Sequence, residues 1–568
     1  MKRLLQSRYG WIVLLVLLLL VNWLAGFRPL RADLTAEKRY TLSAPTKQLL
    51  GSLEGTAQVD VLLSGDMPAG FRKLANSTND LLSEFKSYGK TNFLFRFIKP
   101  GEGLNDTAKA ALYDSLSRLG LHPTNIKAQT KEGEGSEERL VFPGAVITYK
   151  GRTTAIDLLQ GVSATGGLES LNKAEALLEY KFANAIHQLS LDTIPLVGYL
   201  VGNGEPVNDQ VRDLIEGVLA RHYVARILPI DSVPVIPAVF KAMVITKPTG
   251  KFTDLQKLKL DQYVMHGGKL IWMVDNLYAE MDSLLRVQNE FIAFDRALNI
   301  EDQLFKYGVR INLDLVQDLN ADNNPSVVGT VGGKPQIELL PWFYSPLLTN
   351  SNGHPIAKNL DYVLAQFPNS IDTVGAPGIK KTILLHTSSR SRILPSPAKV
   401  SWQRLQTEED FNTFNKSAVP VAVLLEGSFH SLYANRVTEE QQTDLKAGGL
   451  SFQAQSPPNK MIVISDGDIA LNAVTQKEGP LPMGMNPYTK YQYANKDFIQ
   501  NSIEYLVDES GILETRAKDY TLRLLDKKKL EDDKTRWQFI NIAVPVLLIL
   551  LFGYGYQWWR KKKYRFKK

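Results

Sequence analysis

The chain has 568 residues and a formal net charge of +7, but this charge is concentrated at its two ends. The first eight residues carry three basic side chains and the last nine carry seven, which leaves about −3 for everything between. This balance gives no electrostatic footprint for nucleic acid, so we exclude nucleic acid as a partner. Hydrophobic residues make up 44% of the chain, as in ordinary globular proteins, and the absence of cysteine excludes thiol chemistry.

An uncharged apolar stretch near the C-terminus predicts a membrane anchor. FINIAVPVLLILLFGYGY, from Phe539, is about 27 Å long as a helix, close to the ~30 Å hydrocarbon core of a bilayer. Trp537, Trp558 and Trp559 suit the headgroup regions, and a soluble core helix of this length is rarely apolar on every face. We therefore predict a charged stalk at 511–536, a transmembrane helix at 537–557 and a basic cytoplasmic tail at 558–568.

A second apolar stretch lies at the start of the chain. WIVLLVLLLLVNWLAGF, at 11–27, has Trp11 and Trp23 near its ends. A cleaved signal peptide is the alternative, with its best cleavage site after Ala25, but Trp23 stands where a small residue is needed. We expect an uncleaved transmembrane helix at 11–27 after a cytoplasmic N-terminus at 1–10. Two spans in the inner membrane then leave the bulk of the chain in the periplasm, an orientation for which the flanking charges give only a small preference.

Each predicted span carries one asparagine, Asn22 in the first and Asn541 in the second. Because the two spans run in opposite directions, both amides lie at a similar depth near the periplasmic side. Two interpretations stay open: the amides reach interfacial water, or they bond to each other or to a partner helix, which contributes about 0.6–2 kcal/mol. In the second interpretation Gly553 and Gly555 permit close approach of that helix at the other end of the span.

Residues 33–190 alternate strand and helix patterns in the order β-α-β-α-β-β. This order is that of a thioredoxin-like domain. The segment Phe142-Pro143-Gly144 is similar to the cis-proline entry into the third strand of that fold, so we predict a cis peptide bond before Pro143. Without a thiol, such a domain would serve as a scaffold or as a peptide-binding surface.

The sequence pattern of residues 191–510 predicts a second α/β domain. The alternation of strands and helices becomes less regular after about residue 290. Buried strands alternate with helices, and Thr253 with Gln256 three residues later forms a capping box at the start of one helix. Alternation of this kind builds a parallel sheet with helices on both faces. Further strands are expected at 309–318, 382–387, 419–426 and 461–464, and a helix at 497–507.

Several long segments have a distinctive sequence. They are VGYLVGNGEP from Val197, PVAVLLEGSFHSLYANR from Pro420, VISDGD from Val463 and PLPMGMNPYTKYQYANKDF from Pro480. These segments resemble the GldG family of gliding-motility proteins, which shares a class I glutamine-amidotransferase-like, flavodoxin-like domain with intraflagellar transport proteins. Amidotransferase chemistry needs a cysteine nucleophile, so the resemblance implies a non-catalytic domain here.

The same resemblance implies an auxiliary subunit of an ABC-type transporter. Its expected partners are the lipid bilayer, a multi-span permease and a separate cytoplasmic ATPase, with a periplasmic or envelope protein as a further candidate. The chain has no Walker A sequence, GxxxxGK[ST], so ATP hydrolysis would belong to another chain.

Three short features carry candidate chemistry, and each has a plainer structural interpretation. Residues 202–204 (GNG) could present N–H groups to an anion, but they lack the GxGxxG spacing and a P-loop lysine. Asp466 and Asp468 could bind a metal, although an acidic turn accounts for them without further ligands. Ser428 and His430 lie too close in sequence to indicate a triad. We therefore expect no catalytic, cofactor or metal site, and an anchored envelope hydrolase with an acidic or serine centre is the alternative.

Overall fold

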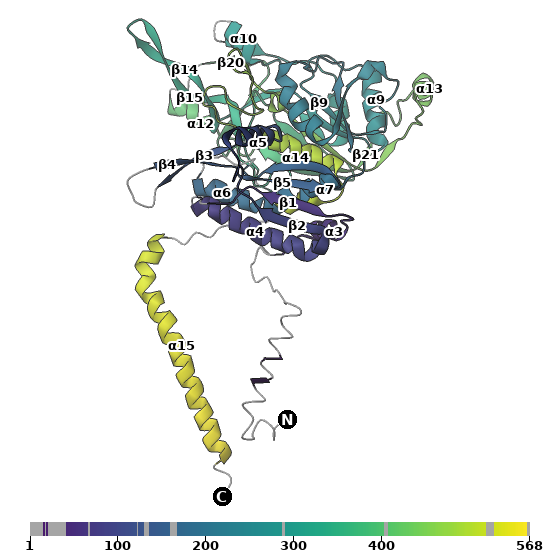
Figure 1. The fold of residues 1–568 in the computed structure, drawn as a ribbon. Coiled ribbons are helices and arrows are strands. Elements are labelled where there is room, and N and C mark those ends of the chain that lie inside the picture. Colours follow the sequence, from purple (N-terminus) through teal and green to yellow (C-terminus); the bar gives the residue numbers. More distant parts are fainter. Residues whose placement is uncertain are drawn as a thin grey trace. The chain divides into compact units, whose positions relative to one another are not determined.

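The structure is a computed structural model (Figure 1). It describes residues 15, 16, 19, 20, 41–65, 67, 69–121, 123–129, 136–159, 167–286, 290–350, 352–402, 407–517 and 527–564. Contacts divide the chain into two units, residues 1–518 and 519–568, and each unit is described by itself.

The first part of the larger unit is built on a four-stranded sheet with the order β2-β1-β5-β6. Its strands are β1 (Ala57–Val61), β2 (Phe93–Phe97), β5 (Gly144–Tyr149) and β6 (Arg152–Asp157). The pair β1–β2 is parallel, and β5 is antiparallel to both β1 and β6, which agrees with the predicted order of elements. The accompanying elements are α3 (Ala44–Gly51), α4 (Ala69–Gly89), α5 (Asp106–Arg118), the hairpin β3 (Thr124–Gln129) and β4 (Ser136–Val141), α6 (Gly167–Ala176) and α7 (Leu178–Ser190).

The cis peptide bond predicted before Pro143 is absent, and that prediction is wrong. Among the described residues the cis bond is Ser396–Pro397. Pro143 instead stands at the centre of a three-residue turn, in which the Gly144 N–H donates to the Phe142 carbonyl over 2.9 Å. The fixed φ of proline suits this turn with a trans peptide bond. The thioredoxin-like assignment thus loses the feature on which it depended, and we describe this part by its topology alone.

The second part is organised by a seven-stranded sheet with the order β18-β21-β22-β10-β9-β7-β8. Its parallel strands are β7 (Leu196–Val201), β8 (Val224–Pro229), β9 (Phe240–Thr246), β10 (Lys269–Met273) and β22 (Gln455–Ile464). Counted along the chain, these five strands have the order 2-1-3-4-5 of flavodoxin-like sheets. Two antiparallel strands, β21 (Pro420–His430) and β18 (Ile379–His386), extend the sheet beyond β22. The predicted parallel sheet is confirmed, whereas the amidotransferase-like name stays a prediction.

Helices cover both faces of this sheet, as predicted. Consecutive strand residues alternate between two apolar cores: Val244 packs in one together with α14 (Asn495–Val507), and Ile245 packs in the other together with α9 (Asp254–Met265). The capping box expected at the start of α9 is present. The π-helix η3 (Asp213–Leu219) also packs on the first face, and the short helix α8 (Ala220–His222) follows it in the chain.

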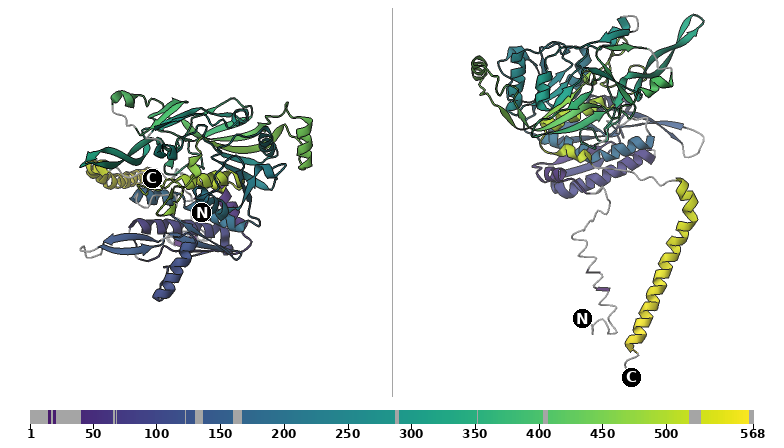
Figure 2. Two further views of the ribbon diagram at one scale, coloured as in Figure 1. Left: turned by 90° about the horizontal axis from the view of Figure 1, so that it is seen from above. Right: turned by 180° about the vertical axis from the view of Figure 1, so that it is seen from behind.

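Additional elements lie between β10 and β22, where the sequence pattern is irregular. The longest are β14 (Ala321–Val331) and β15 (Lys334–Leu348), an antiparallel hairpin that projects from the body (Figures 1 and 2). The others are α10 (Met281–Arg286), β11 (Glu290–Ala293), α11 (Glu301–Tyr307), β12 (Val309–Ile311), β13 (Asp314–Asp318), β16 (Val363–Leu364), β17 (Ile371–Thr373), β19 (Ser391–Pro395), β20 (Ala398–Ser401), α12 (Glu408–Asn412) and α13 (Glu439–Ala447).

One helix joins the two parts of the body. α7 packs against β5 and β6 and also against η6 (Ile512–Ala517), which follows the second part. The Tyr180 hydroxyl donates to Glu504 Oε2 over 2.6 Å, and the Arg516 guanidinium lies 4.8 Å from the centre of the Tyr180 ring. One apolar core contains residues from both parts. Packing is therefore continuous across residue 190, where the predicted domain boundary stays a prediction.

Phe182, which is fully buried in this shared core, tests the coupling of the two parts. Phe182→Ala should lower the free energy of unfolding by about 3–5 kcal/mol, because it removes a large apolar side chain and leaves a cavity. The body's three tryptophans, at 272, 342 and 402, all lie in the second part. In Phe182→Ala, their fluorescence should therefore report unfolding of the full chain at a lower midpoint urea concentration. Phe305→Ala, at a side chain that is 51% exposed, is the control, and an unchanged tryptophan midpoint in Phe182→Ala would mean that the parts unfold separately.

Candidate functional site

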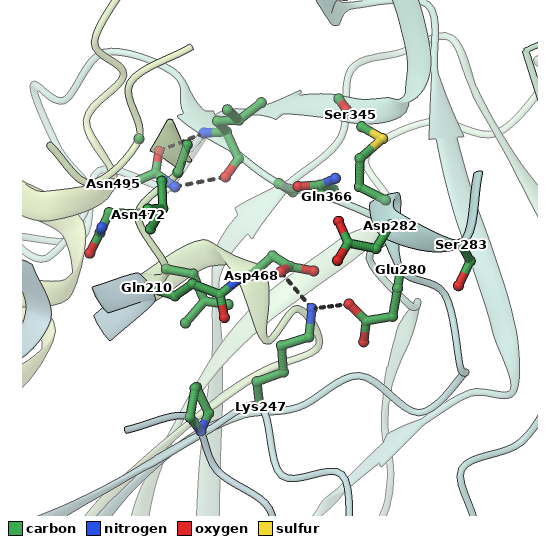
Figure 3. A pocket seen from close by; sticks show the side chains of 18 of the residues that line it. Gln210, Lys247, Glu280, Asp282, Ser283, Ser345, Gln366, Asp468, Asn472 and Asn495 are labelled. Carbon is green, nitrogen blue, oxygen red and sulfur yellow. Dashed lines mark hydrogen bonds and ion pairs between the residues drawn. The ribbon is translucent and has the colours of Figure 1, made fainter. Parts of the chain in front are cut away.

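The carboxyl ends of the parallel strands meet along one edge of the large sheet. β7 runs into residues 202–205, β9 into Lys247, β10 into Asp275 and β22 into residues 466–468. In open α/β sheets ligands bind outside this edge, at the point where the strand order reverses, which here lies between β7 and β9. A cavity of about 970 Å³ is lined by residues that follow these strands, and Lys247 and Asp468 lie at its floor (Figure 3).

The turn that follows β7 is closed by the chain itself. The Asn203 carbonyl accepts the N–H groups of Thr249 and Gly250 over 2.9 and 2.7 Å, and the Asn203 N–H donates to Glu205 Oε2 over 2.8 Å. An internal carboxylate therefore uses a donor that a bound anion would need. Gly204 has a φ of +83°, and a Cβ there would lie 2.1 Å from Thr249 Oγ1. This geometry favours the plain turn over an anion site.

A buried lysine lies among carboxylates at the floor of the cavity. Lys247 Nζ is 2.5 Å from Asp468 Oδ1 and 3.0 Å from Glu280 Oε2 (Figure 3). It is also 3.4 Å from Asp275 Oδ2. Burial opposes the charge on Lys247, but the three carboxylates outweigh burial and raise the pKa of the lysine. Lys247 is therefore an ammonium ion at neutral pH. Its backbone has a φ of +46°, which is uncommon for a non-glycine residue and is found preferentially at functional sites.

The two aspartates considered as metal ligands are held by other groups of the chain. Asp466 accepts the N–H groups of Gln366 and Asp468, each over 2.7 Å. Asp275 joins them, with one oxygen of each aspartate within 4.8 Å of the others. The ammonium group of Lys247 already supplies a cation to this cluster. The chemistry is that of an ion cluster completed by lysine, and the expectation that no metal binds stays a prediction.

Burial and repulsion both act on the carboxyl groups of this cluster. The pKa of Asp466 is raised by burial and then by the negative charges of Asp275 and Asp468. Gly467 permits the close packing, because its N–H donates to Asp275 Oδ1 over 2.6 Å and a Cβ there would lie 2.7 Å from Lys247 Cγ. The Asp-Gly-Asp sequence thus brings the turn after β22 directly against Lys247.

The residues considered for a hydrolase are not brought together. His430 pairs with Gln455 at the start of β22, whereas Asp466 follows the end of that ten-residue strand. A strand rises about 3.3 Å per residue, so the two side chains are roughly 30 Å apart. Ser428 pairs with Pro458, also near the start of β22. No shared centre of Asp466 and His430 can form at this distance.

Lys247, Asp275 and Glu280 are site residues that the sequence analysis did not single out. Lys247 and Asp275 each follow a buried strand closely, and this position is the signal that indicates a shared sheet edge. Glu280 lies in the loop after β10, where no pattern distinguishes it from other surface acids.

The smaller unit contains one helix that is long and apolar enough to cross a membrane. It spans Arg536–Lys562 within α15 (Lys527–Tyr564), with a mean hydropathy of 2.0. The predicted contact and anchor residues on this helix are exposed: Trp537, Asn541, Gly553, Gly555, Trp558 and Trp559. Trp11, Asn22 and Trp23 lie outside the described residues, so the predicted first span is not tested.

Helix geometry separates the two glycines of α15. At about 100° per residue, Gly555 lies roughly 40° around the helix from Asn541, whereas Gly553 lies roughly 120° away. Asn541 and Gly555 therefore share one face of α15, and Gly553 is on another. A partner helix that contacts Asn541 would meet Gly555 and not Gly553.

Comparison with known proteins places the chain in a family. Residues 195–502, more than half of the chain, match the family described as an ABC-type uncharacterized transport system. The chain belongs to this family. Residues 36–148 of this ABC-transport auxiliary protein also match a domain of unknown function (DUF7088). No curated protein gives a significant match.

Two solved structures similar to this ABC-transport auxiliary protein share little sequence with it. The mmIFT52 N-terminal domain is 14% identical, with 55% of this chain and 96% of that chain covered and a TM-score of 0.29. The exo-beta-1,4-mannosidase Op5Man5 from Opitutaceae bacterium strain TAV5 is 12% identical, with 84% and 56% covered and a TM-score of 0.21. With scores this low, neither structure contributes to the assignment of fold or activity.

Replacing the buried lysine should expose the cost of the carboxylates around it. Lys247→Met should lower the free energy of unfolding by about 3–5 kcal/mol at pH 7, because it leaves buried charges without a cation. A carboxyl group whose pKa is raised by folding stabilises the folded state most at pH values below its unfolded pKa of about 3.9. This stabilisation is lost as the pH rises through the folded pKa. The loss in Lys247→Met should therefore be smaller at pH 5 than at pH 7.

Urea denaturation of the full chain at both pH values measures this difference. Lys251→Met, at an exposed lysine of the same loop, is the matched control and should change stability little. An equal loss for Lys247→Met at both pH values would show that unpaired carboxylates are not its cause.

Proposed function

We propose that this chain is a non-catalytic, membrane-anchored auxiliary subunit of an ABC-type transporter complex associated with bacterial gliding motility. The observation that carries the proposal is the family match over residues 195–502. The apolar helix at Arg536–Lys562 supports anchoring in the inner membrane. In this proposal the body is periplasmic, both termini are cytoplasmic, and the partners are a multi-span permease and a separate ATPase.

The chemistry of the sheet edge supports a non-catalytic role. Asp275 and Asp466 are buried and accept backbone N–H groups, and Asp468 pairs with Lys247, so the chain itself holds all three acids. The alternative of an envelope hydrolase would need one of these acids beside a nucleophile or a base. His430 is far from them, at the opposite end of β22.

We place the permease contact on the face of α15 that carries Asn541 and Gly555. The Asn541 side chain is exposed within its own chain, and an amide in lipid gains from a partner that donates and accepts hydrogen bonds. Gly555 on the same face lets a second helix approach closely at the other end of the span. The bond between Asn541 and Asn22 stays a prediction.

Co-purification from mild detergent tests the proposal. The native chain should bring down a multi-span permease and a cytoplasmic ATPase, identified by mass spectrometry. Replacing both Asn22 and Asn541 with leucine should reduce permease recovery about threefold or more, because an interhelical amide bond contributes about 0.6–2 kcal/mol.

Two single substitutions sharpen this experiment. Gly555→Leu should reduce recovery, because it blocks close approach on the Asn541 face, whereas Gly553→Leu changes the same residue type on another face and should have little effect. Recovery of the native chain alone in several mild detergents would contradict the auxiliary role. Loss in Gly553→Leu equal to that in Gly555→Leu would contradict the assigned face.

A further inference from the structure

The cavity at the sheet edge carries an excess of negative charge. Its lining includes two cationic residues, Lys247 and Arg296, with side chains 8% and 3% exposed. Both cations are already paired with carboxylates of the chain: Lys247 with Asp468 and Glu280, and Arg296 with Glu280. Among the residues that the structure describes, the lining carboxylates number five, namely Glu280, Asp282, Asp295, Asp322 and Asp468. The interior therefore repels anions and attracts cations.

One of these carboxylates is buried without a cation among the described residues. Asp322 is 5% exposed and accepts hydrogen bonds from the Tyr493 hydroxyl and from Asn486 Nδ2, each over 2.7 Å, and from the Asn323 N–H over 2.8 Å. All three donors are neutral, so they satisfy the oxygens without bringing a positive charge to Asp322. Asp295, by contrast, is exposed at the rim.

Neutral polar side chains in the wall are free to bind a ligand. Asn324 and Ser345 are 7% and 4% exposed, line the cavity, and make no side-chain hydrogen bond within the part of the chain that the structure describes. Gln366 also lines the cavity, and its side chain forms no such bond there (Figure 3). These side chains therefore leave donors and acceptors available to a ligand in the cavity.

The rim of the cavity adds apolar surface. Tyr278, Phe294, Val474 and Tyr488 line it with exposed fractions between 44% and 57%. Aromatic and aliphatic groups at the rim suit the methylene stems of lysine and arginine, whose charged ends reach the carboxylates beyond. The volume of about 970 Å³ is at the upper end of the ~300–1,000 Å³ range of ligand pockets, so it holds more than a single ion.

We propose that this cavity binds an extended polypeptide segment of a partner or cargo protein, and that it recognises the lysine or arginine side chains of that segment. The carboxylates receive the basic side chains, and Asn324, Ser345 and Gln366 bond to the peptide groups between them. The excess negative charge favours this occupant over a neutral oligosaccharide, which would use the amides but not the charge. The inference deepens the proposed function by naming the chemistry of a second partner.

Fluorescence anisotropy on the purified full chain in neutral detergent tests the inference without any transporter component. The probe is a fluorescein-labelled Gly-Lys-Lys-Lys-Gly peptide, with Gly-Glu-Glu-Glu-Gly as the opposite-charge control and chitotriose as a competitor. We expect the lysine peptide alone to bind, and to bind more weakly as salt is raised from about 50 to 300 mM. Failure of this experiment leaves the co-purification result intact, because the two assays share no component other than the chain.

Rim variants locate the binding. Asp282→Asn with Asp295→Asn changes two exposed acids isosterically and should weaken binding about fivefold or more. Glu439→Gln with Glu440→Gln removes the same charge from exposed positions on α13, which do not line the cavity, and should leave the affinity within about twofold. Equal weakening by both pairs, salt-independent binding of chitotriose, or no binding of the lysine peptide would each overturn the proposal.

Discussion

The buried ammonium group of Lys247 is the interaction on which the functional edge of this protein depends. It lies within 3.4 Å of three carboxylates from two segments, Asp275 and Glu280 after β10 and Asp468 after β22. Carboxylates buried this closely would have to take up protons if no cation lay among them. The lysine therefore fixes the ends of β9, β10 and β22 relative to one another. Lys247, Glu280 and Asp468 all line the cavity, so this ion cluster forms part of its wall.

Much of the fold follows from the sequence because local patterns determine it. Short continuous apolar runs located the parallel strands, and side-chain capping located the start of α9. The hairpin of β14 and β15 was missed, because its outer half is exposed on both faces and shows no alternation. The trans peptide bond at Pro143 was also missed, since a three-residue turn closed by one hydrogen bond enters the strand equally well.

The candidate site was predicted only in part. Asp466 and Asp468 were noticed because they end a buried strand, but their role was not, since it depends on a lysine 221 residues away from Asp468. The metal-site interpretation rests on the two acids alone, because the local sequence does not indicate that Lys247 pairs with Asp468. Long-range charge pairing of this kind leaves no periodic signal in a chain.

Membership in the ABC-type transport auxiliary family and the apolar helix of α15 support the central proposal, that this chain is a subunit anchored beside a permease. Photo-crosslinking in native membranes tests this claim most directly, with a photoreactive amino acid placed at position 541, 555 or 553 and the products identified by mass spectrometry. The account predicts crosslinks to one multi-span membrane protein from positions 541 and 555 and few from position 553. Crosslinks from all three positions to lipid or to a second copy of this chain alone would contradict it.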